Sequence, residues 1–200
     1  MANKILFVNA CVREQSRTLA LAEYFLGMLN GEIHEINLNE VKISPLTRES
    51  LAARKELLKK RKYDDPTLRF AWDFAAADTI VIAAPYWDFS FPALLKIYLE
   101  AVSVSGITYR YSNGLPRGLC RAKRLVYITA AGGIVDFDFG YNYIHTLAKD
   151  FFGIPEAVCF RAEDLDFGDV SEEVILNEVK AKMGRYLLKA YDLKLNMMKQ

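Results

Sequence analysis

The 200-residue sequence has few cysteines, and their spacing does not suggest a shared site. Cys11, Cys120 and Cys159 are far apart, with no CxxC pair and no Cys/His spacing typical of a metal site. Three isolated cysteines also argue against a disulfide framework of the kind found in small secreted domains. We therefore expect a reduced, cytoplasmic protein without a bound metal, whose cysteines are mostly small buried side chains and not reactive thiols.

Long hydrophobic runs and an excess of charge are also missing. No segment approaches the roughly 18 apolar residues of a membrane-spanning helix. The apolar run near the N-terminus ends at Asn9, which is unlike a signal peptide. The net charge is +1, from 26 basic and 25 acidic residues, which argues against a broad nucleic-acid-binding face. We expect a protein that binds neither membranes nor nucleic acids.

What the sequence does contain is an alternation of short apolar runs with amphipathic segments. Five runs are typical of strands: those at 4–9, 78–85 and 123–130 are typical of buried strands, 32–38 alternates as a strand does, and 156–163 is the last. Six segments are typical of helices, at 16–29, 50–63, 66–77, 92–104, 142–153 and 171–195. No repeat, low-complexity tract or linker interrupts them, so we expect one domain over residues 1–200.

The order of these elements predicts the fold class. Strands separated mostly by helices form a parallel sheet covered on both faces. Right-handed crossovers then give a doubly wound α/β sandwich of three layers. Ligands of such sheets bind outside the carboxyl ends of the strands, at the switch point. The candidate site therefore lies in the loops after Asn9, Ala84 and Thr129.

The first loop, NACVREQSRT at 9–18, has features of an anion site although it lacks the GxGxxG and GxxxxGK[ST] patterns. Ser16 and Thr18 place hydroxyl groups where the next helix begins. Free N–H groups and the helix dipole favour an anion there, and Arg13 and Arg17 add positive charge. The alternative is that Ser16 only caps the helix and that the arginines are solvated.

The second loop, APYWDFSFPA at 84–93, is unusually aromatic. An ordinary strand-to-helix turn needs a glycine or a small polar residue, whereas this one clusters Tyr86, Trp87 and Phe89. Exposed aromatic rings commonly face a partner surface. A planar ligand at this edge would be covered by the rings while backbone groups bond its polar rim. The alternative is that the rings pack on neighbouring helices.

The third loop, TAAGGIVDFDFGYNY at 129–143, combines two glycines with more rings. Gly132 and Gly133 allow a positive φ and a close approach of the backbone to a ligand, although a plain Gly-Gly turn is an equal alternative. The aromatic residues that follow are Phe137, Phe139, Tyr141 and Tyr143. Because all three loops share one sheet edge, together they match a mononucleotide that carries a flat ring system.

The middle of the chain resembles a known family. The segment APYWDFSFPALLKIYLEAVSVSGITYRYSNGLPRGLCRAKRLVYITAAGG, at 84–133, is similar to FMN-dependent NAD(P)H oxidoreductases of flavodoxin-like fold, which include NADH-azoreductases and quinone reductases. Their pattern is A-P-aromatic or Met-aromatic-N-F, a helix with "LK.Y.D", then "G.TF.Y...GP.GL" and a strand ending in "S.GG". The resemblance extends to about Asp169, thinly over 43–68. It implies a flavodoxin-like sandwich around a five-stranded parallel sheet.

The resemblance also implies where FMN binds. The first loop would hold the phosphate, the second would border the isoalloxazine ring, and the third would contact the far side of the ring through backbone groups. The implied cofactor-binding residues are Ala10, Ser16, Arg17, Thr18, Pro85, Tyr86, Trp87, Asp88, Phe89, Ala130, Ala131, Gly132 and Gly133.

Three positions depart from the family pattern. Asp88 stands where relatives usually have Asn, and an ionised carboxylate cannot donate a hydrogen bond to a flavin carbonyl. Asn9 and Ala10 replace a usual Ser-Ser pair, so one phosphate hydroxyl is absent, and an arginine of the loop is a candidate substitute. No His follows Gly133, where relatives often carry one, which leaves protonation to water or a Tyr.

The implied activity is cofactor chemistry without a catalytic side chain. Hydride would pass from NADH or NADPH through FMN to a small aromatic acceptor, a quinone or else an azo or nitro compound, in ping-pong order. The acceptor slot would include Trp87, Phe89, Phe137 and Tyr141, with rings from a second subunit of a homodimer. Three alternatives stay open: an electron-carrier flavoprotein, a flavodoxin-like binding module without flavin, and an FMN reductase that releases reduced flavin.

Overall fold

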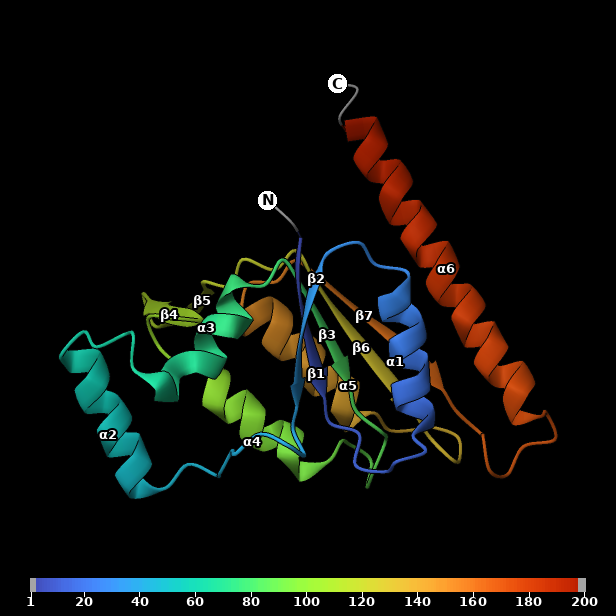
Figure 1. Ribbon diagram of the computed structural model, residues 1–200, viewed down its shortest axis with the longest axis horizontal. Helices are drawn as coiled ribbons and strands as arrows, with labels where there is room; N and C mark the ends of the chain where they lie inside the picture. The colour runs from blue at the N-terminus through green and yellow to red at the C-terminus, as the bar shows by residue number, and fades with distance from the viewer. Residues whose placement is uncertain (1–2, 198–200) are drawn as a thin grey trace.

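The computed structural model describes residues 3–197, with side chains of the last helix described as far as residue 190. Figure 1 shows a central twisted sheet between two layers of helices. The described elements are, in chain order, β1 (Lys4–Asn9), α1 (Arg17–Gly27), β2 (Glu32–Asn37), α2 (Arg48–Lys59), η1 (Pro66–Leu68), α3 (Arg69–Ala76), β3 (Thr79–Ala83), α4 (Ala93–Val102), β4 (Tyr109–Ser112), β5 (Leu115–Gly118), β6 (Arg124–Ala130), α5 (Phe139–Thr146), η2 (Leu147–Phe151), β7 (Glu156–Ala162) and α6 (Glu172–Met197).

The main sheet has the doubly wound topology that the sequence predicts. Its strand order is β2-β1-β3-β6-β7, and every neighbouring pair is parallel. The chain leaves β1 toward one edge of the sheet and then, from β3, winds toward the other edge. The loops after β1 and β3 therefore diverge at a switch point, which opens a crevice at the carboxyl ends of the strands.

Two hydrophobic cores hold the layers together, one on each face of the sheet. Alternate residues of the central strands point to opposite faces, as the period of two requires. Leu6, Ile80 and Tyr127 belong to the core beneath α3, α4 and α5. Phe7 and Val81 belong to the core beneath α1 and α6. All of these side chains are buried, which explains why the strands read as continuous apolar runs.

The prediction of a doubly wound three-layer sandwich with a five-stranded parallel sheet is confirmed. The helix expected at 142–153 begins three residues earlier, because the Asp138 side chain accepts a hydrogen bond from the N–H of Tyr141 and caps α5. Its last part, η2, is a wider turn that ends before Gly153 at φ +74°. The antiparallel hairpin of β4 and β5, which turns at Asn113 and Gly114, was not predicted from the sequence.

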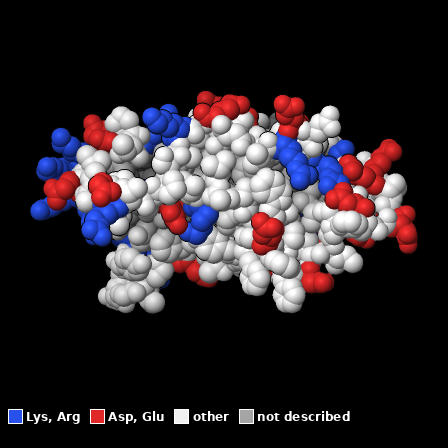
Figure 2. Space-filling view, turned by 90° about the horizontal axis from the view of Figure 1, so that it is seen from below, with Lys and Arg blue, Asp and Glu red and all other residues white. Residues whose placement is uncertain are grey.

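Among residues 3–197, no helix combines the length and the apolar character needed to span a membrane. Figure 2 looks at the molecule from below, toward the carboxyl ends of the sheet strands. The middle of this face is mostly uncharged, whereas basic and acidic side chains gather toward its two ends. The candidate site lies at this edge of the sheet.

Candidate cofactor site

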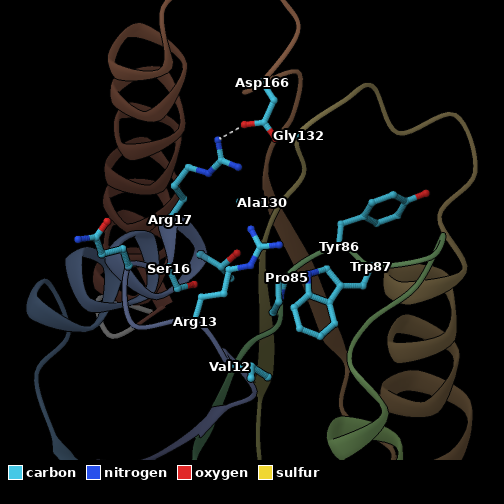
Figure 3. A pocket seen from close by; sticks show the side chains of 12 residues that line it. Val12, Arg13, Ser16, Arg17, Pro85, Tyr86, Trp87, Ala130, Gly132 and Asp166 are labelled. Carbon is cyan, nitrogen blue, oxygen red and sulfur yellow. Dashed lines mark hydrogen bonds and ion pairs between the residues drawn. The ribbon is translucent and has the colours of Figure 1, made fainter.

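A cavity of about 160 Å³ opens at the carboxyl edge of the sheet, where the three loops predicted from the sequence meet (Figure 3). It is lined by Val12, Arg13, Gln15, Ser16, Arg17, Thr18, Pro85, Tyr86, Trp87, Ala130, Gly132 and Asp166. Eight of these were predicted as cofactor-binding residues: Ser16, Arg17, Thr18, Pro85, Tyr86, Trp87, Ala130 and Gly132. Each loop that the sequence analysis selected thus contributes to one cavity.

Other predicted residues stand behind or beside this cavity. Ala10 and Ala131 are buried, and their N–H groups donate to backbone oxygens of neighbouring strands. Asp88, Phe89 and Gly133 do not line it. For these five residues, as for the eight that line the cavity, contact with a cofactor stays a prediction.

The sequence analysis did not select Val12, Gln15 or Asp166. The first two lie within a loop that it had chosen, and only the choice of side chains was incomplete. Asp166 follows β7, whose carboxyl end lies at the same edge of the sheet. The rule that located the other loops, applied to this strand as well, would have found it.

One end of the cavity is the start of α1. Ser16 is the N-cap, and its Oγ accepts a hydrogen bond from the N–H of Leu19 at 3.2 Å. The first N–H groups of a helix have no partner within it, and the dipole makes this end positive. The buried Thr18 and the guanidinium group of Arg13 stand beside these groups. Ser16 therefore caps the helix and also lines the cavity, and its contact with an anion stays a prediction.

Arg17 is less available to an anion than its position in the sequence suggests. Its Nη1 lies 2.7 Å from Oδ1 of Asp166 and 3.3 Å from Oε2 of Glu172. The hydrogen bond from Arg17 holds the pKa of the Asp166 carboxyl below its usual value. The guanidinium group that was expected to meet a phosphate is thus already paired with carboxylates of the same chain.

The other end of the cavity is the aromatic turn after β3. Trp87 and Ser90 pair through two hydrogen bonds, N to O at 3.1 Å and at 2.7 Å in the reverse direction. Between them, Asp88 has a φ of +50° and Phe89 a φ of +64°. Two central residues at positive φ are the mark of a type I′ turn, which usually carries Asn-Gly. The turn presents Trp87 to the cavity and leaves Phe89 58% exposed.

The positive φ that we expected at Gly132 or Gly133 is found in this aromatic turn instead. Gly132 has a different role, because a Cβ atom on it would clash with the carboxylate of Asp166. We expected a ligand to approach the backbone of Gly132 closely, but the Asp166 side chain occupies that space.

Hydrogen bonds tie the third loop to the second and to β7. The N–H of Tyr86 donates to Ala130 O at 3.0 Å, and its hydroxyl donates to Phe137 O. The N–H of Phe139 donates to Phe89 O at 3.0 Å. In addition, Asp138 pairs with Arg161 of β7, and Glu163 accepts from the N–H of Val135. These contacts hold the mouth of the cavity in one arrangement.

The aromatic residues predicted for the acceptor slot are in different places. Phe137 is 62% exposed beside the cavity, with its ring centroid 6.5 Å from that of Phe89. Tyr141 does not line the cavity: its ring stacks on Tyr127 and its hydroxyl donates to Ala157 O at 2.9 Å. The acceptor slot itself stays a prediction.

The cysteines pack as small apolar side chains do. Burial raises the pKa of the Cys11 thiol to about 11 and those of Cys120 and Cys159 to about 12. Such thiols are weak nucleophiles at neutral pH. Across residues 3–197, no group of three or more His, Cys, Asp or Glu side chains is arranged to hold a metal ion.

The donor set of the cavity fits a phosphate joined to a flat ring. The start of α1, the hydroxyl groups of Ser16 and Thr18 and the guanidinium group of Arg13 are suited to the phosphate. Tyr86 and Trp87, at the opposite end, are suited to the ring. The residues present are therefore compatible with FMN.

The fold and the site together define a flavodoxin-like protein. The family model described as "Flavodoxin-like fold" matches residues 3–187. Two solved structures share this architecture. The azoreductase from Bacillus anthracis str. Sterne has a TM-score of 0.80 at 22% identity, over 92% of this chain and 98% of that one. The FMN-dependent NADH-azoreductase from Bacillus anthracis str. Ames Ancestor, in complex with FMN, has a TM-score of 0.74 at 23% identity, over 92% and 99%.

Curated relatives specify the family further. The FMN-dependent NADH:quinone oxidoreductase 2 of Clostridium acetobutylicum is 34% identical over 195 residues, which cover 90% of this chain and 96% of that protein. The FMN-dependent NADH:quinone oxidoreductase of Coprothermobacter proteolyticus is 33% identical over 184 residues, which cover 86% and 90%. The chain belongs to this family of flavodoxin-like proteins, and the resemblance read from its sequence is confirmed.

Proposed function

We propose that the protein is an FMN-dependent NADH:quinone oxidoreductase, which passes hydride from NADH through FMN to an acceptor in ping-pong order. The observation that carries the proposal is the single cavity that joins the start of α1 to the aromatic turn after β3. The names and the coverage of the curated relatives support it. Bound FMN supplies the hydride chemistry, and the protein binds, orients and shields it.

The residues of the cavity divide this work between them. The N–H groups at the start of α1, with Ser16 and Thr18, would hold the phosphate. Trp87 and Tyr86 would border the ring, and the two hydrogen bonds of Tyr86 to the third loop keep this wall in place. Backbone groups of the third loop at Ala130 and Gly132, which line the cavity, would contact the ring. No side chain is assigned as a general acid or base.

The acceptor we propose is a small aromatic molecule, a quinone first and an azo or nitro aromatic second. The support is the pair of exposed rings of Phe89 and Phe137 beside the cavity, in edge-to-face contact. Such rings provide an apolar surface for a flat acceptor. Tyr141 would join them only after a change of side-chain position.

We also propose that the protein is a cytoplasmic homodimer. Ile134, Phe137, Phe139 and Phe167 are each more than 60% exposed, and all lie in or beside the third loop. An exposed apolar patch of this kind is typical of an interface. Light scattering coupled to size exclusion should give twice the mass of the 22.8 kDa chain. A mass of one chain at micromolar concentration contradicts the dimer but not the site.

A visible spectrum followed by anaerobic reduction tests the activity. The purified protein should be yellow or become so with added FMN, NADH should bleach it, and a quinone should restore the colour. A yellow protein that NADH does not bleach identifies an electron carrier. A protein that never takes up FMN identifies a binding module, and loss of reduced flavin on gel filtration identifies an FMN reductase.

A further inference from the structure

The phosphate end of the cavity contains carboxylates as well as cations. Asp166 lies in the segment after β7, and its Oδ1 is 2.7 Å from Nη1 of Arg17. The same nitrogen is 3.3 Å from Oε2 of Glu172, the first residue of α6. Figure 3 shows Arg17 turned toward Asp166, whereas Arg13 points across the cavity. The two cations that line the cavity are thus balanced by the two carboxylates in contact with Arg17.

The backbone holds Asp166 in this position. Its N–H donates to the carbonyl oxygen of Gly132 at 2.8 Å, and the N–H of Asp164 donates to that of Gly133 at 3.0 Å. The carboxylate also occupies the space that a Cβ atom on residue 132 would fill. Asp166 is therefore seated against the third loop at the wall of the cavity, although its side chain is still 48% exposed.

We propose that Asp166 lowers the preference of the site for FMN over riboflavin, because its carboxylate competes with the phosphate of FMN for Arg17. A phosphate at the start of α1 is attracted by Arg13 and by the helix N-terminus, and it is repelled by Asp166. Arg17 contributes to phosphate binding only to the extent that it leaves Asp166. The inference rests on the proposed FMN site, and it assigns a specificity role to a residue outside the three predicted loops.

A different role for the same ion pair predicts the opposite change in FMN affinity when the charge of Asp166 is removed. If Asp166 instead held Arg17 in the orientation that the phosphate needs, removing its charge would loosen a preformed site and weaken FMN. If Asp166 competes, removing its charge frees the guanidinium group and lowers the repulsion, so FMN binds more tightly. Riboflavin has the same ring system but no phosphate, so it separates effects at the ring from effects at the phosphate.

The experiment compares FMN and riboflavin on the full-length, flavin-free chain, with binding followed by flavin fluorescence. Asp166→Asn keeps the size of the side chain and removes its charge. We expect it to lower the dissociation constant for FMN about tenfold and to change that for riboflavin less than about twofold. Glu173→Gln is the matched control, because it removes a neighbouring exposed charge of α6. We expect it to change the FMN constant less than about twofold.

A second variant tests whether Arg17 is the group that Asp166 withholds. Arg17→Met should weaken FMN only about twofold in the wild-type background, where the guanidinium group is already paired. In the Asp166→Asn background the same change should weaken FMN binding about tenfold, so the effects of the two substitutions on the binding free energy should not be additive. Circular dichroism of each variant verifies that it is folded.

The outcomes are distinguishable. If Asp166→Asn weakens FMN, or shifts FMN and riboflavin equally, the competition between Asp166 and the phosphate is overturned while the FMN site stands. If Arg17→Met weakens FMN binding equally in the wild-type and Asp166→Asn backgrounds, Arg17 is not the group that Asp166 withholds from the phosphate. A wild-type chain that binds neither flavin contradicts the proposed function, and this inference with it.

Discussion

Asp88 and Phe89 occupy backbone conformations that L-residues rarely adopt, in the turn that carries Trp87. Asn is more easily accommodated at positive φ than Asp or Phe. The turn therefore carries local strain next to the cavity. This strain gives the departure from the family pattern at Asp88 a physical meaning besides its charge.

Replacing Asp88 by Asn should relieve part of this strain. We expect Asp88→Asn to raise the free energy of unfolding by about 0.5 kcal/mol, measured by urea denaturation of the flavin-free protein. The variant should keep or tighten FMN binding, because an amide can donate to a flavin carbonyl. Loss of flavin binding in this variant contradicts our account of the turn.

Trp87 lines the cavity, and its backbone is paired with that of Ser90 by two hydrogen bonds. Trp87→Ala should weaken FMN binding or slow acceptor reduction about fivefold, since a ring contact of this kind contributes roughly 1 kcal/mol. Titration with FMN and anaerobic stopped-flow reduction measure the two effects.

Trp72 provides the control for that substitution. It is also half-exposed, but it lies on α3, where its Nε1 donates to the backbone oxygen of Tyr63. Trp72→Ala removes the same ring from a place outside the cavity and should leave flavin binding unchanged. Equal effects of the two substitutions would show that the loss at Trp87 is not local.

At the scale of elements, a partly buried ion pair with β7 helps to hold the third loop. Asp138 pairs with Arg161 and also caps α5, by accepting from the N–H of Tyr141 at 2.6 Å. Nε of Arg161 is buried without a hydrogen-bond partner among the described residues, so this side chain relies on the contacts of its other nitrogens. Nη1 of Arg161 also lies 3.9 Å from Oε2 of Glu163, so removal of Asp138 leaves the guanidinium group with only the more distant of its two carboxylates.

Asp138→Ala should therefore lower the free energy of unfolding by about 2 kcal/mol, from the lost helix cap and from the loss of the closer of the two carboxylates that contact Arg161. Urea denaturation measures the change. Asp136→Ala is the control, because that residue is exposed and lies two positions earlier in the same loop. If the two variants are equally stable, the contact with Arg161 does not hold the loop.

The elements also show what the sequence could and could not predict. The central strands β1, β3 and β6 were found because each is an apolar run buried on both faces. The edge strand β2 is mostly exposed and was found from its alternation instead. The β4–β5 hairpin was missed because its strands have four residues each and are mostly exposed, so they carry no apolar pattern. The Asn113-Gly114 pair was a usable signal of its turn.

Prediction of the site failed where the chain departs from common local rules. An Asp-Phe pair is not a recognisable type I′ turn, so the conformation of the aromatic loop was not predicted. The partnership of Arg17 with Asp166 joins residues 149 positions apart, and no local pattern indicates such a contact. The parts that were predicted depend on strand ends, which the topology places together.

At the scale of the whole molecule, the thiols shielded from water make the free energy of unfolding fall as the pH rises into the alkaline range. Burial raises the pKa of Cys120 from 9.0 to about 12 in the folded protein. Between pH 9 and 12 the folded state consequently holds a proton that the unfolded state has lost. The stabilisation is therefore complete below pH 9 and is lost as the pH rises through this range.

Cys120→Ala should have a shallower decline of unfolding free energy between pH 9 and pH 11 than the wild type. The difference should reach about 2 to 3 kcal/mol at pH 11, from about 1.4 kcal/mol for each pH unit. Urea denaturation at a series of pH values measures it, and because tyrosines titrate in both proteins, only the difference is informative. Parallel pH profiles contradict the assignment.

The contacts of Arg17 with Asp166 and Glu172 join α1 to the segment after β7 and to the start of α6. Because Asp166 is 149 positions after Arg17, the two sides of this wall leave the ribosome at different times. The cavity wall at Asp166 can form only after β7 has joined the sheet. A nascent chain in which only α1 and the aromatic turn have folded therefore has an incomplete site for the flavin.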